Sequence, residues 1–284
     1  MIFFDAQGNQ IPPAQWMSTY ERSYFLNQPK QNGQPRNQTS PFVENQVCTL
    51  LRQTSPLSRQ DLILAMAWKI GLIDHSLSEA SQRVEYRQDW PTKLTAKTQF
   101  RVLDFSTSIP HLAASMPRIA HISQTNPQHL YTLAPRPKGF GHVYILTVVF
   151  FVTRGRHPIY DKYAHIAALA ISQGLPPGSF VNYKEGQKWS DYQLYGKLLL
   201  PIAKACPPDP ETPWMFVSRP LDRALWVYGH LFHTDSKACE ARNRVQAYPQ
   251  AEPTRSVDLK GILVGRICDY PIPRAMAGDV ERST

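Results

Sequence analysis

Apolar residues recur at helical spacing in several stretches of the chain, and this pattern predicts a mainly α-helical protein. The clearest stretch, RQDLILAMAWKIGL, begins at Arg59 directly after Ser58, which is placed to cap a helix. Asp61 follows in the first turn, where a carboxylate is favoured by the helix dipole. Two later stretches, SDYQLYGKLLLPIAKAC from Ser190 and RPLDRALWVYGHLF from Arg219, share this periodicity. We expect a helix in each of the three places.

The stretch from Val143 to Thr153, VYILTVVFFVT, is apolar almost all the way round. Such a run fits a buried helix or a buried strand, and its periodicity does not choose between them. Its surroundings favour a helix, because a glycine-bearing turn precedes it and DKYAHIAALAISQG follows it. In that second segment Asp161 is placed to cap a helix and Gly174 to end it. We therefore predict a helix, a tight turn and a second helix here.

The two ends of the chain have a different composition from the middle. Residues 1–45 are rich in Gln, Asn and Pro, a composition that buries little apolar area, and they are predicted to form an N-terminal arm without regular elements. Residues 46–247 are predicted to form the helical domain, with short, proline-divided elements between about 101 and 133. Residues 248–284 form a proline-rich C-terminal tail. The expected fold is mainly α, with irregular arms at both ends.

The chain is basic, with 31 Lys and Arg against 22 Asp and Glu, a net charge of +9 and a pI of about 9.4. An anionic partner such as a nucleic acid fits this charge, although a basic surface can also simply be solvated. The sequence begins without a recognisable signal peptide, and the longest apolar run is too short to span a bilayer. We therefore expect a cytoplasmic protein that is not embedded in a membrane.

Metal and cofactor sites are not expected. The four cysteines, Cys48, Cys206, Cys239 and Cys268, are far apart in the sequence, with no paired spacing of the kind that metal sites use. A zinc site can be assembled on paper from His230, His233 and Cys239, but the two histidines lie in an aromatic helical stripe and no fourth ligand is near. We expect reduced thiols and no zinc.

A short glycine motif, Lys138-Gly139-Phe140-Gly141-His142, precedes the apolar stretch. Two glycines at this spacing let the backbone turn its N–H groups outward, and N–H groups at a helix N-terminus form a seat for a phosphate. Nearby positive charge would come from Lys138, His142, Arg154 and Arg156. The alternative is a turn between helices whose glycines serve geometry alone.

Asp161 lies 20 residues after Gly141, where a short helical hairpin would bring it back toward a bound nucleic-acid backbone. Cleavage of a glycosidic bond develops positive charge on the sugar, and a fixed carboxylate can stabilise this charge or orient an attacking water. The alternative is that Asp161 is only a helix cap. The two roles can coincide in one residue, since a cap is kept ionised by the helix dipole.

Residues 136–171 resemble the helix-hairpin-helix-GPD superfamily of DNA glycosylases, in which a glycine hairpin, a buried helix and a catalytic aspartate follow one another. The segment Pro158-Ile159-Tyr160-Asp161 is similar to that of the adenine-glycosylase branch, and the 8-oxoguanine-glycosylase branch is a second relative. The resemblance implies a two-lobed helical fold. It also implies that residues 139–142 clamp DNA and that Asp161 is catalytic.

The chain departs from the superfamily in three places. Members with lyase activity carry a lysine two residues after the second glycine, whereas this chain has Val143, so the resemblance implies a monofunctional enzyme. The four-cysteine loop of several branches is missing, and no iron–sulfur cluster is expected. The helix that contains Asp61 loosely matches an early core helix, but residues 69–71 replace the segment that carries an inserted wedge residue. The wedge is therefore not identified.

The stretch from Arg219 resembles a late helix that walls the base pocket of the 8-oxoguanine branch. This makes Asp222 and Trp226 candidate pocket residues, and Tyr163 a candidate contact to the base or a phosphate. For the aromatic residues, the alternative is packing in the core.

The expected function is that of a monofunctional DNA glycosylase. Such an enzyme flips a damaged or modified base out of duplex DNA and hydrolyses its N-glycosidic bond to leave an abasic site. The alternative is a non-catalytic DNA-binding protein that keeps the hairpin as a phosphate clamp. The target base is open between oxidised purines, mispaired adenine, alkylated bases and a hypermodified cytosine of phage DNA, the last as an antiviral defence.

Overall fold

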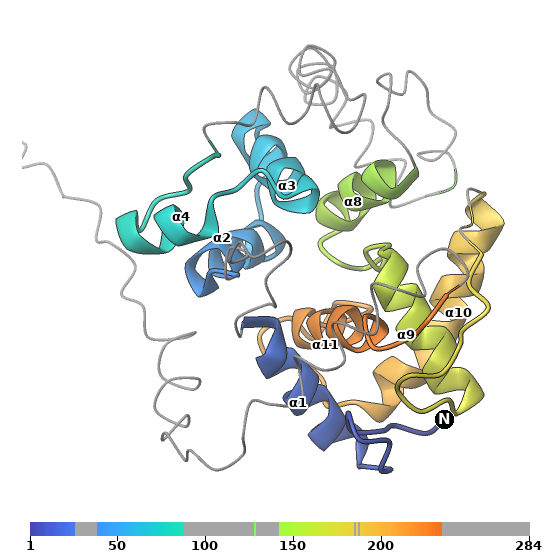
Figure 1. Ribbon diagram of the computed structural model, residues 1–284. Helices are drawn as coiled ribbons and strands as arrows, with labels where there is room; N and C mark the ends of the chain where they lie inside the picture. Colours follow the sequence, from blue (N-terminus) through green and yellow to red (C-terminus); the bar gives the residue numbers. More distant parts are fainter. Residues whose placement is uncertain (26–38, 88–127, 129–141, 185, 187, 235–284) are drawn as a thin grey trace, which may run out of the picture. The chain divides into compact units, whose positions relative to one another are not determined.

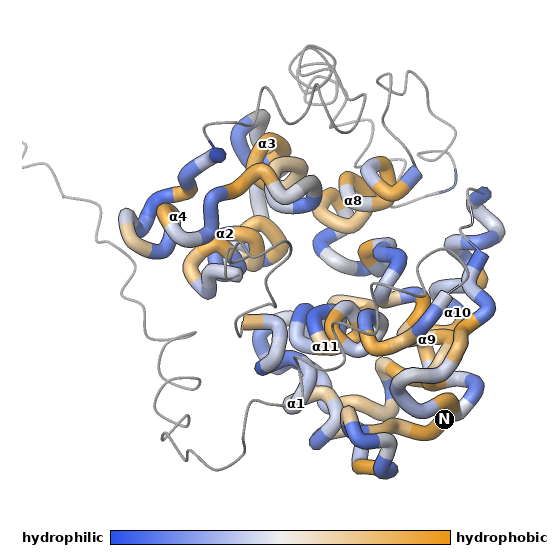
Figure 2. The backbone as a smooth tube through the Cα atoms, in the orientation of Figure 1, coloured by the Kyte–Doolittle hydropathy of each residue, from blue (hydrophilic) through white to orange (hydrophobic). Residues whose placement is uncertain are grey.

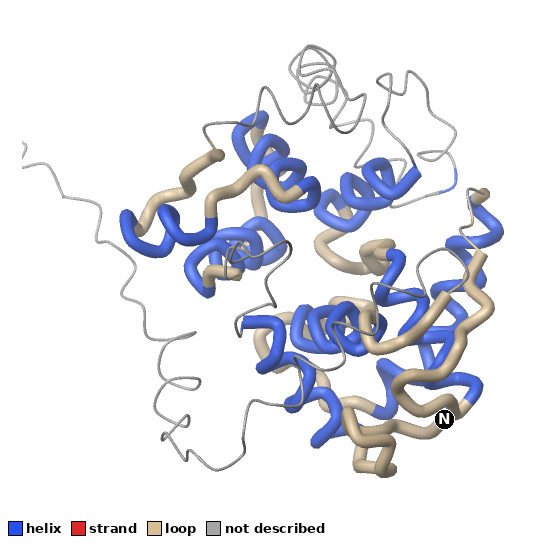
Figure 3. Tube along the Cα trace, viewed as in Figure 1, coloured by secondary structure: helices blue, strands red, loops and turns tan. Residues whose placement is uncertain are grey.

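The computed structural model describes residues 1–25, 39–87, 128, 142–184, 186 and 188–234. These residues form eight helices, and in place of strands they contain only isolated β-bridges (Figure 3). The expectation of a mainly α protein is confirmed for this part of the chain. None of the described helices is both long enough and apolar enough to cross a membrane.

Two sets of helices pack among themselves (Figure 1). In chain order the helices are α1 (Pro13–Phe25), α2 (Pro41–Arg52), α3 (Arg59–Ile70), α4 (His75–Ser81), α8 (His142–Val152), α9 (Lys162–Gln173), α10 (Trp189–Ala205) and α11 (Arg219–Gly229). Helix α11 packs against α1 and α9, and α10 also packs against α9. Helix α2 packs against α3 and α4, and α3 packs against α8.

The ends of α3 and α9 follow the local signals in the sequence. At the start of α3, the backbone N–H of Asp61 donates to the Ser58 hydroxyl and the N–H of Ser58 donates to the Asp61 carboxylate. Asp161 caps the start of α9, as predicted. Gly71 and Gly174 end the two helices in the left-handed conformation, with φ of 73° and 65°, which glycine adopts without a steric penalty.

The apolar stretch after His142 is a helix, α8, so the helix interpretation is correct. Its residues contribute to two separate hydrophobic clusters, because Leu146 packs with residues of α9, α10 and α11 whereas Phe150 and Phe151 pack with residues of α2 and α3. Figure 2 shows α8 as a largely hydrophobic segment. Burial on two sides explains why this helix has no polar face.

The prediction that residues 1–45 lack regular elements is wrong for the described part of this segment. Helix α1 occupies residues 13–25 and buries Trp16 and Tyr20, which lie four residues apart on one face. Both rings pack against Tyr228 of α11, with ring centroids 5.3 Å and 4.8 Å away. The average composition of the segment, dominated by Gln, Asn and Pro, concealed this apolar face.

The predicted domain boundary at residue 46 falls inside α2. This helix starts at Pro41, and the N–H of Val43 donates to the hydroxyl of the capping residue Ser40. Proline in the first turn costs no hydrogen bond, because the N–H groups there lack intrahelical partners. Apart from residue 128, the expected short elements between about 101 and 133 lie outside the described residues, as does the C-terminal tail.

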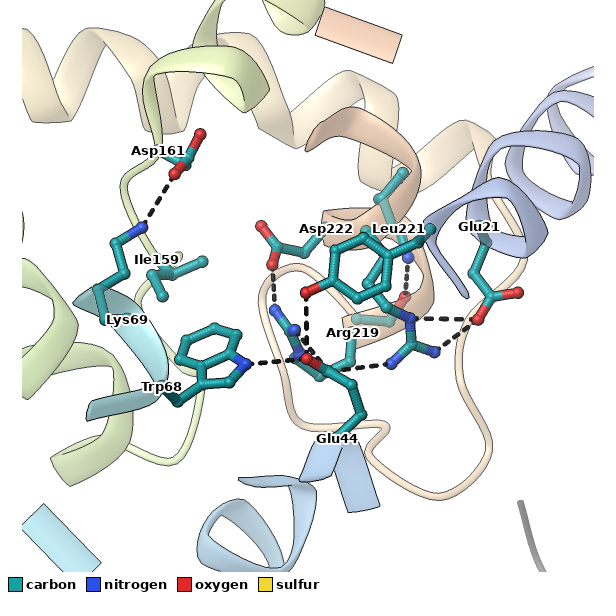
Figure 4. Close-up of polar contacts among 12 residues, drawn as sticks. Glu21, Glu44, Trp68, Lys69, Ile159, Asp161, Arg219, Leu221 and Asp222 are labelled. Carbon is teal, nitrogen blue, oxygen red and sulfur yellow. Dashed lines mark hydrogen bonds and ion pairs between the residues drawn. The ribbon is translucent and has the colours of Figure 1, made fainter. Parts of the chain in front are cut away.

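A buried ionic cluster around Glu44 joins four helices (Figure 4). The Glu44 side chain is 3% exposed and accepts hydrogen bonds from Arg219 Nη2 at 2.9 Å, Trp68 Nε1 at 2.9 Å and the Tyr24 hydroxyl at 3.1 Å. Arg223 adds a second cation, 3.6 Å from Glu44 and 2.7 Å from Glu21. Burial alone would raise the pKa of Glu44, but Arg219 and Arg223 lower it to about 2. The carboxylate is therefore ionised at neutral pH.

Replacing Glu44 by Gln is expected to lower the free energy of unfolding by about 3–5 kcal/mol at pH 7, because it leaves buried arginine charge without its partner. Urea denaturation of the variant and the parent measures this difference. The matched control is Glu211→Gln, which breaks the exposed pair Arg52–Glu211, whose side chains are 38% and 39% exposed. This pair contributes less than about 1 kcal/mol. Equal effects of the two substitutions would contradict the role assigned to Glu44.

Candidate functional site

Asp161 is held by two hydrogen bonds, one to each carboxylate oxygen. Oδ1 accepts the backbone N–H of Tyr163 at 2.9 Å, which caps α9, and Oδ2 accepts from Lys69 Nζ at 3.0 Å (Figure 4). The Asp161 side chain is 23% exposed and that of Lys69 is 11% exposed. The carboxylate is thus fixed in orientation without being sealed inside the hydrophobic core.

The segment that leads into Asp161 is fixed by side chains from other helices. Three successive carbonyl oxygens in it each accept a hydrogen bond from such a side chain. Because this segment is not helical, these side chains take the place of helical hydrogen-bond partners. The pairs are Pro158 with the Tyr192 hydroxyl (2.7 Å), Ile159 with the Tyr195 hydroxyl (3.4 Å) and Tyr160 with Lys69 Nζ (3.2 Å). The backbone that presents Asp161 is therefore positioned by α10 and α3.

The side chain of Tyr160 anchors the same segment from inside the core. Its ring is buried, and its hydroxyl lies 3.1 Å from His165 Nδ1 and 3.3 Å from the Tyr183 hydroxyl. Burial lowers the pKa of His165 to about 4, so this imidazole is neutral at pH 7. The residue before Asp161 thus has both its carbonyl and its hydroxyl in defined contacts.

The surroundings of Asp161 keep its carboxylate ionised. Burial by itself would raise the pKa of Asp161, but the charge and hydrogen bond of Lys69 and the N–H of Tyr163 lower it below its ordinary value. The charge of His230 acts in the same direction. At neutral pH, Asp161 is an anion that can stabilise positive charge, and it is unsuited to donate a proton.

Aromatic side chains lie next to the start of α9. The ring of Tyr163 stacks on that of His230, with centroids 3.5 Å apart and an interplanar angle of 20°. Trp226 meets the two rings edge-on, at 6.3 Å from Tyr163 and 4.2 Å from His230. His230 Nδ1 donates to the Trp226 carbonyl oxygen at 2.7 Å, which fixes the imidazole. Tyr163 and Trp226 are half-buried, so part of this aromatic cluster is accessible.

Asp222 connects the site to the buried ionic cluster. It forms an ion pair with Arg219, and its side chain is 12% exposed. Burial raises the pKa of Asp222, and the attraction of Arg219 and Lys69 offsets this only in part. Repulsion from Asp161 also raises the pKa of Asp222, and the charge of Lys69 lowers the pKa of both carboxylates. Asp161 and Asp222, both singled out from the sequence, are therefore electrostatically coupled.

The residues expected to contact DNA are only partly described. Lys138, Gly139, Phe140 and Gly141 lie outside the described residues, whereas His142 is the half-buried first residue of α8. Arg154 has a positive φ of 54°, and its guanidinium donates to the Thr54 carbonyl oxygen. Arg156 is exposed. Arg154 therefore has a structural partner within the protein.

Sequence reasoning did not identify several residues that hold the site. Lys69 stands 92 positions before Asp161. In the sequence it was noted only because residues 69–71 replace the segment that carries the wedge residue in the resembled superfamily. Tyr192 and Tyr195 belong to the apolar pattern of α10, and His230 to the aromatic stripe of α11. None of these positions carries a local signal that points to Asp161, because the contacts are made by packing between helices.

No protein-family model, curated protein or solved structure matches the chain.

Within the described residues, no group of three or more His, Cys, Asp or Glu side chains could hold a metal ion. Cys48 and Cys206 are free thiols, and burial raises the pKa of both.

Gly229 allows α9 and α11 to approach closely at the site. A methyl group there would overlap the backbone carbonyl oxygen of Tyr163, so Gly229→Ala must push the two helices apart. We expect a loss of about 1–3 kcal/mol in the free energy of unfolding, measured by urea denaturation. The control, Gly196→Ala in α10, adds its methyl group to open space and is expected to raise stability by about 0.5–1 kcal/mol. A neutral Gly229→Ala would contradict this packing.

Proposed function

We propose that this protein is a monofunctional DNA glycosylase that flips a base from duplex DNA and hydrolyses its N-glycosidic bond. The observation that carries the proposal is the carboxylate of Asp161, which is ionised, fixed by Lys69 and the N–H of Tyr163, and still partly exposed. Fixed negative charge beside a sugar stabilises the oxocarbenium-like transition state of glycosidic cleavage. Little reorganisation is needed at the moment of reaction, because the carboxylate is already oriented.

The reaction balances without a cofactor. The bond between C1′ and the base nitrogen breaks, its electron pair leaves with the base, and positive charge develops on the sugar. A water oxygen then bonds to C1′, and its proton passes to the departing base or to solvent. An ionised carboxylate accepts roughly four hydrogen bonds, so the two made by Asp161 to described residues leave acceptor positions that can orient this water.

The order of elements before Asp161 supports a helix-hairpin-helix glycosylase fold. A buried helix, α8, follows the glycine motif, and a short fixed segment then leads to the capped start of α9. We place residues 138–142 as the clamp on the DNA backbone, with Arg156 and the net charge of +9 contributing attraction to phosphates. In this proposal, phosphate contacts position the DNA and leave base choice to the pocket.

The aromatic cluster supports a role in holding the extruded base. Tyr163 and Trp226 are half-buried and lie in contact with His230, which interacts electrostatically with Asp161. Enzymes that act on flipped nucleotides stack the base on such aromatic side chains. We assign Tyr163 and Trp226 to the pocket wall, and Asp222 to its polar side near Lys69.

The contacts of Lys69 support the monofunctional assignment. A Schiff base requires a neutral amine whose lone pair is available, whereas Lys69 Nζ donates to the Tyr160 carbonyl oxygen and to Asp161 Oδ2. An ammonium in these contacts has no lone pair to attack an aldehyde. Lys69 is therefore not the nucleophile, and water takes that role in the proposed reaction.

Replacing Asp161 by Asn is expected to slow base release strongly while the affinity for duplex DNA is retained. Asparagine still caps a helix, so α9 is preserved, but the negative charge that stabilises the sugar cation is lost. The loss in rate is expected to be about 100-fold or more, by analogy with removal of one transition-state electrostatic partner. Single-turnover base release and a DNA-binding titration measure the two properties.

The matched control for this test is Asp74→Asn. Asp74 caps α4 through the N–H of Leu77, away from the candidate site, and its substitution should leave base release at the rate of the parent. Unchanged release by Asp161→Asn would remove this residue from the mechanism. A parent protein that binds DNA and releases no base would instead favour a non-catalytic DNA-binding protein.

Borohydride treatment of the parent protein during turnover is expected to leave no covalent protein–DNA adduct. Reduction traps a Schiff base, and the proposed mechanism forms none. Denaturing gel electrophoresis of a labelled duplex checks this. A duplex that already contains an abasic site serves as a second substrate, so that trapping does not depend on prior release of the unidentified target base. Any trapped band would contradict the monofunctional assignment, and its disappearance in Lys69→Met would identify Lys69 as the amine that reacts.

The target base is identified by mass spectrometry of bases released from phage DNA and host DNA. We include a hypermodified cytosine of phage DNA among the candidate substrates. Its selective release would support antiviral defence, whereas release of oxidised, mispaired or alkylated bases from host DNA would support genome repair.

A further inference from the structure

We propose that Lys69 is the positioning residue of this site, and that it holds Asp161 in its reactive orientation and charge state. This inference rests on the proposed function. The geometry that carries it is the pair of contacts from one ammonium to successive residues, at 3.2 Å to the Tyr160 carbonyl oxygen and 3.0 Å to Asp161 Oδ2. Lys69 thus fixes both the backbone before Asp161 and the carboxylate itself.

Lys69 is presented by a rigid part of the protein. It lies in the last turn of α3, where a cation is favoured by the helix dipole. The preceding residue, Trp68, donates its indole N–H to the buried Glu44 and packs under Arg219, whose guanidinium carbon lies 4.9 Å from the ring centroid. The turn that carries Lys69 is therefore held by the buried ionic cluster, and the ammonium itself is held by its contacts to Tyr160 and Asp161.

The low exposure of the pair strengthens its coupling. Charges at 3.0 Å, with side chains 11% and 23% exposed, are screened less by water than a surface pair. Other titratable groups of the described residues that interact with Asp161 include Asp222 on α11, His230 just after α11 and Tyr195 on α10. Lys69 differs from these three because its side chain hydrogen-bonds directly to the Asp161 carboxylate.

The test compares Lys69→Met with Lys69→Arg over a range of pH. Methionine is unbranched and only one atom shorter than lysine, and it removes the charge, so Asp161 should protonate at higher pH and lose its fixed orientation. We expect single-turnover base release to fall about 100-fold at pH 7, because misplacement of a reacting group by about 1 Å has this effect. The acid limb of the pH profile should move to higher pH. Arginine keeps the cation and should restore the position of that limb.

A matched control separates positioning of the backbone from control of the charge. Tyr192→Phe removes the hydrogen bond to the Pro158 carbonyl oxygen in the same segment and leaves the Asp161 carboxylate pair intact. Its acid limb should stay at the pH of the parent. A Lys69→Met protein that is folded, as judged by circular dichroism, and releases bases at or above the parent rate with an unshifted limb would overturn the inference.

A second measurement tests whether Lys69 acts through Asp161 or on the DNA itself. In the Asp161→Asn background, Lys69→Met should leave DNA affinity and its salt dependence unchanged. A weaker affinity with a reduced salt slope would overturn the inference, because it would make Lys69 a phosphate contact. The two proposals fail in different ways: a parent protein that releases no base refutes the proposed function, whereas an active parent that is insensitive to Lys69→Met refutes only the positioning role.

Discussion

The ionic cluster around Glu44 is the interaction on which the arrangement of the site depends. Buried charges are costly unless they are paired and hydrogen-bonded, and Glu44 meets both conditions through Arg219, Trp68 and Tyr24. These partners come from α11, α3 and α1, whereas Glu44 is on α2. The cluster therefore fixes the helix turn that presents Lys69 and, through Asp222, the first turn of α11 beside it. The cluster thereby specifies which helices pack against one another.

The candidate site is built so that its central residue needs little rearrangement. Asp161 follows a segment whose carbonyl oxygens are held by Tyr192, Tyr195 and Lys69, and its own oxygens are held by a backbone N–H and an ammonium. Groups fixed in this way pay their ordering cost during folding, and electrostatic stabilisation of a transition state is strongest when its source is already oriented. Packing between helices thus determines the chemistry that Asp161 can support.

Local signals allowed the helices of the site to be predicted from sequence, and the contacts between them could not be. Ser58 with Asp61, and Asp161 with Gly174, act on neighbouring backbone groups, so the start of α3 and both ends of α9 followed from a few residues each. The Lys69–Asp161 pair joins positions 92 residues apart, and Arg219–Glu44 joins positions 175 apart. Nothing local specifies such pairs. Helix α1 was missed for a different reason, because average composition outweighed the four-residue spacing of its buried rings.

Helix capping and ion pairing explain why residue 161 is polar, and together they favour aspartate. Asparagine or serine would cap α9 about as well, but neither would compensate the charge of Lys69, which is largely withdrawn from solvent. Helix capping and ion pairing therefore favour aspartate at position 161 even without catalysis. They do not require its side chain to be accessible, because a cap and an ion pair can both be completed in full burial. Neither the cap nor the ion pair accounts for the 23% exposure of the Asp161 side chain beside half-buried aromatic rings. In the proposed function, this exposure lets the carboxylate contact a bound nucleotide.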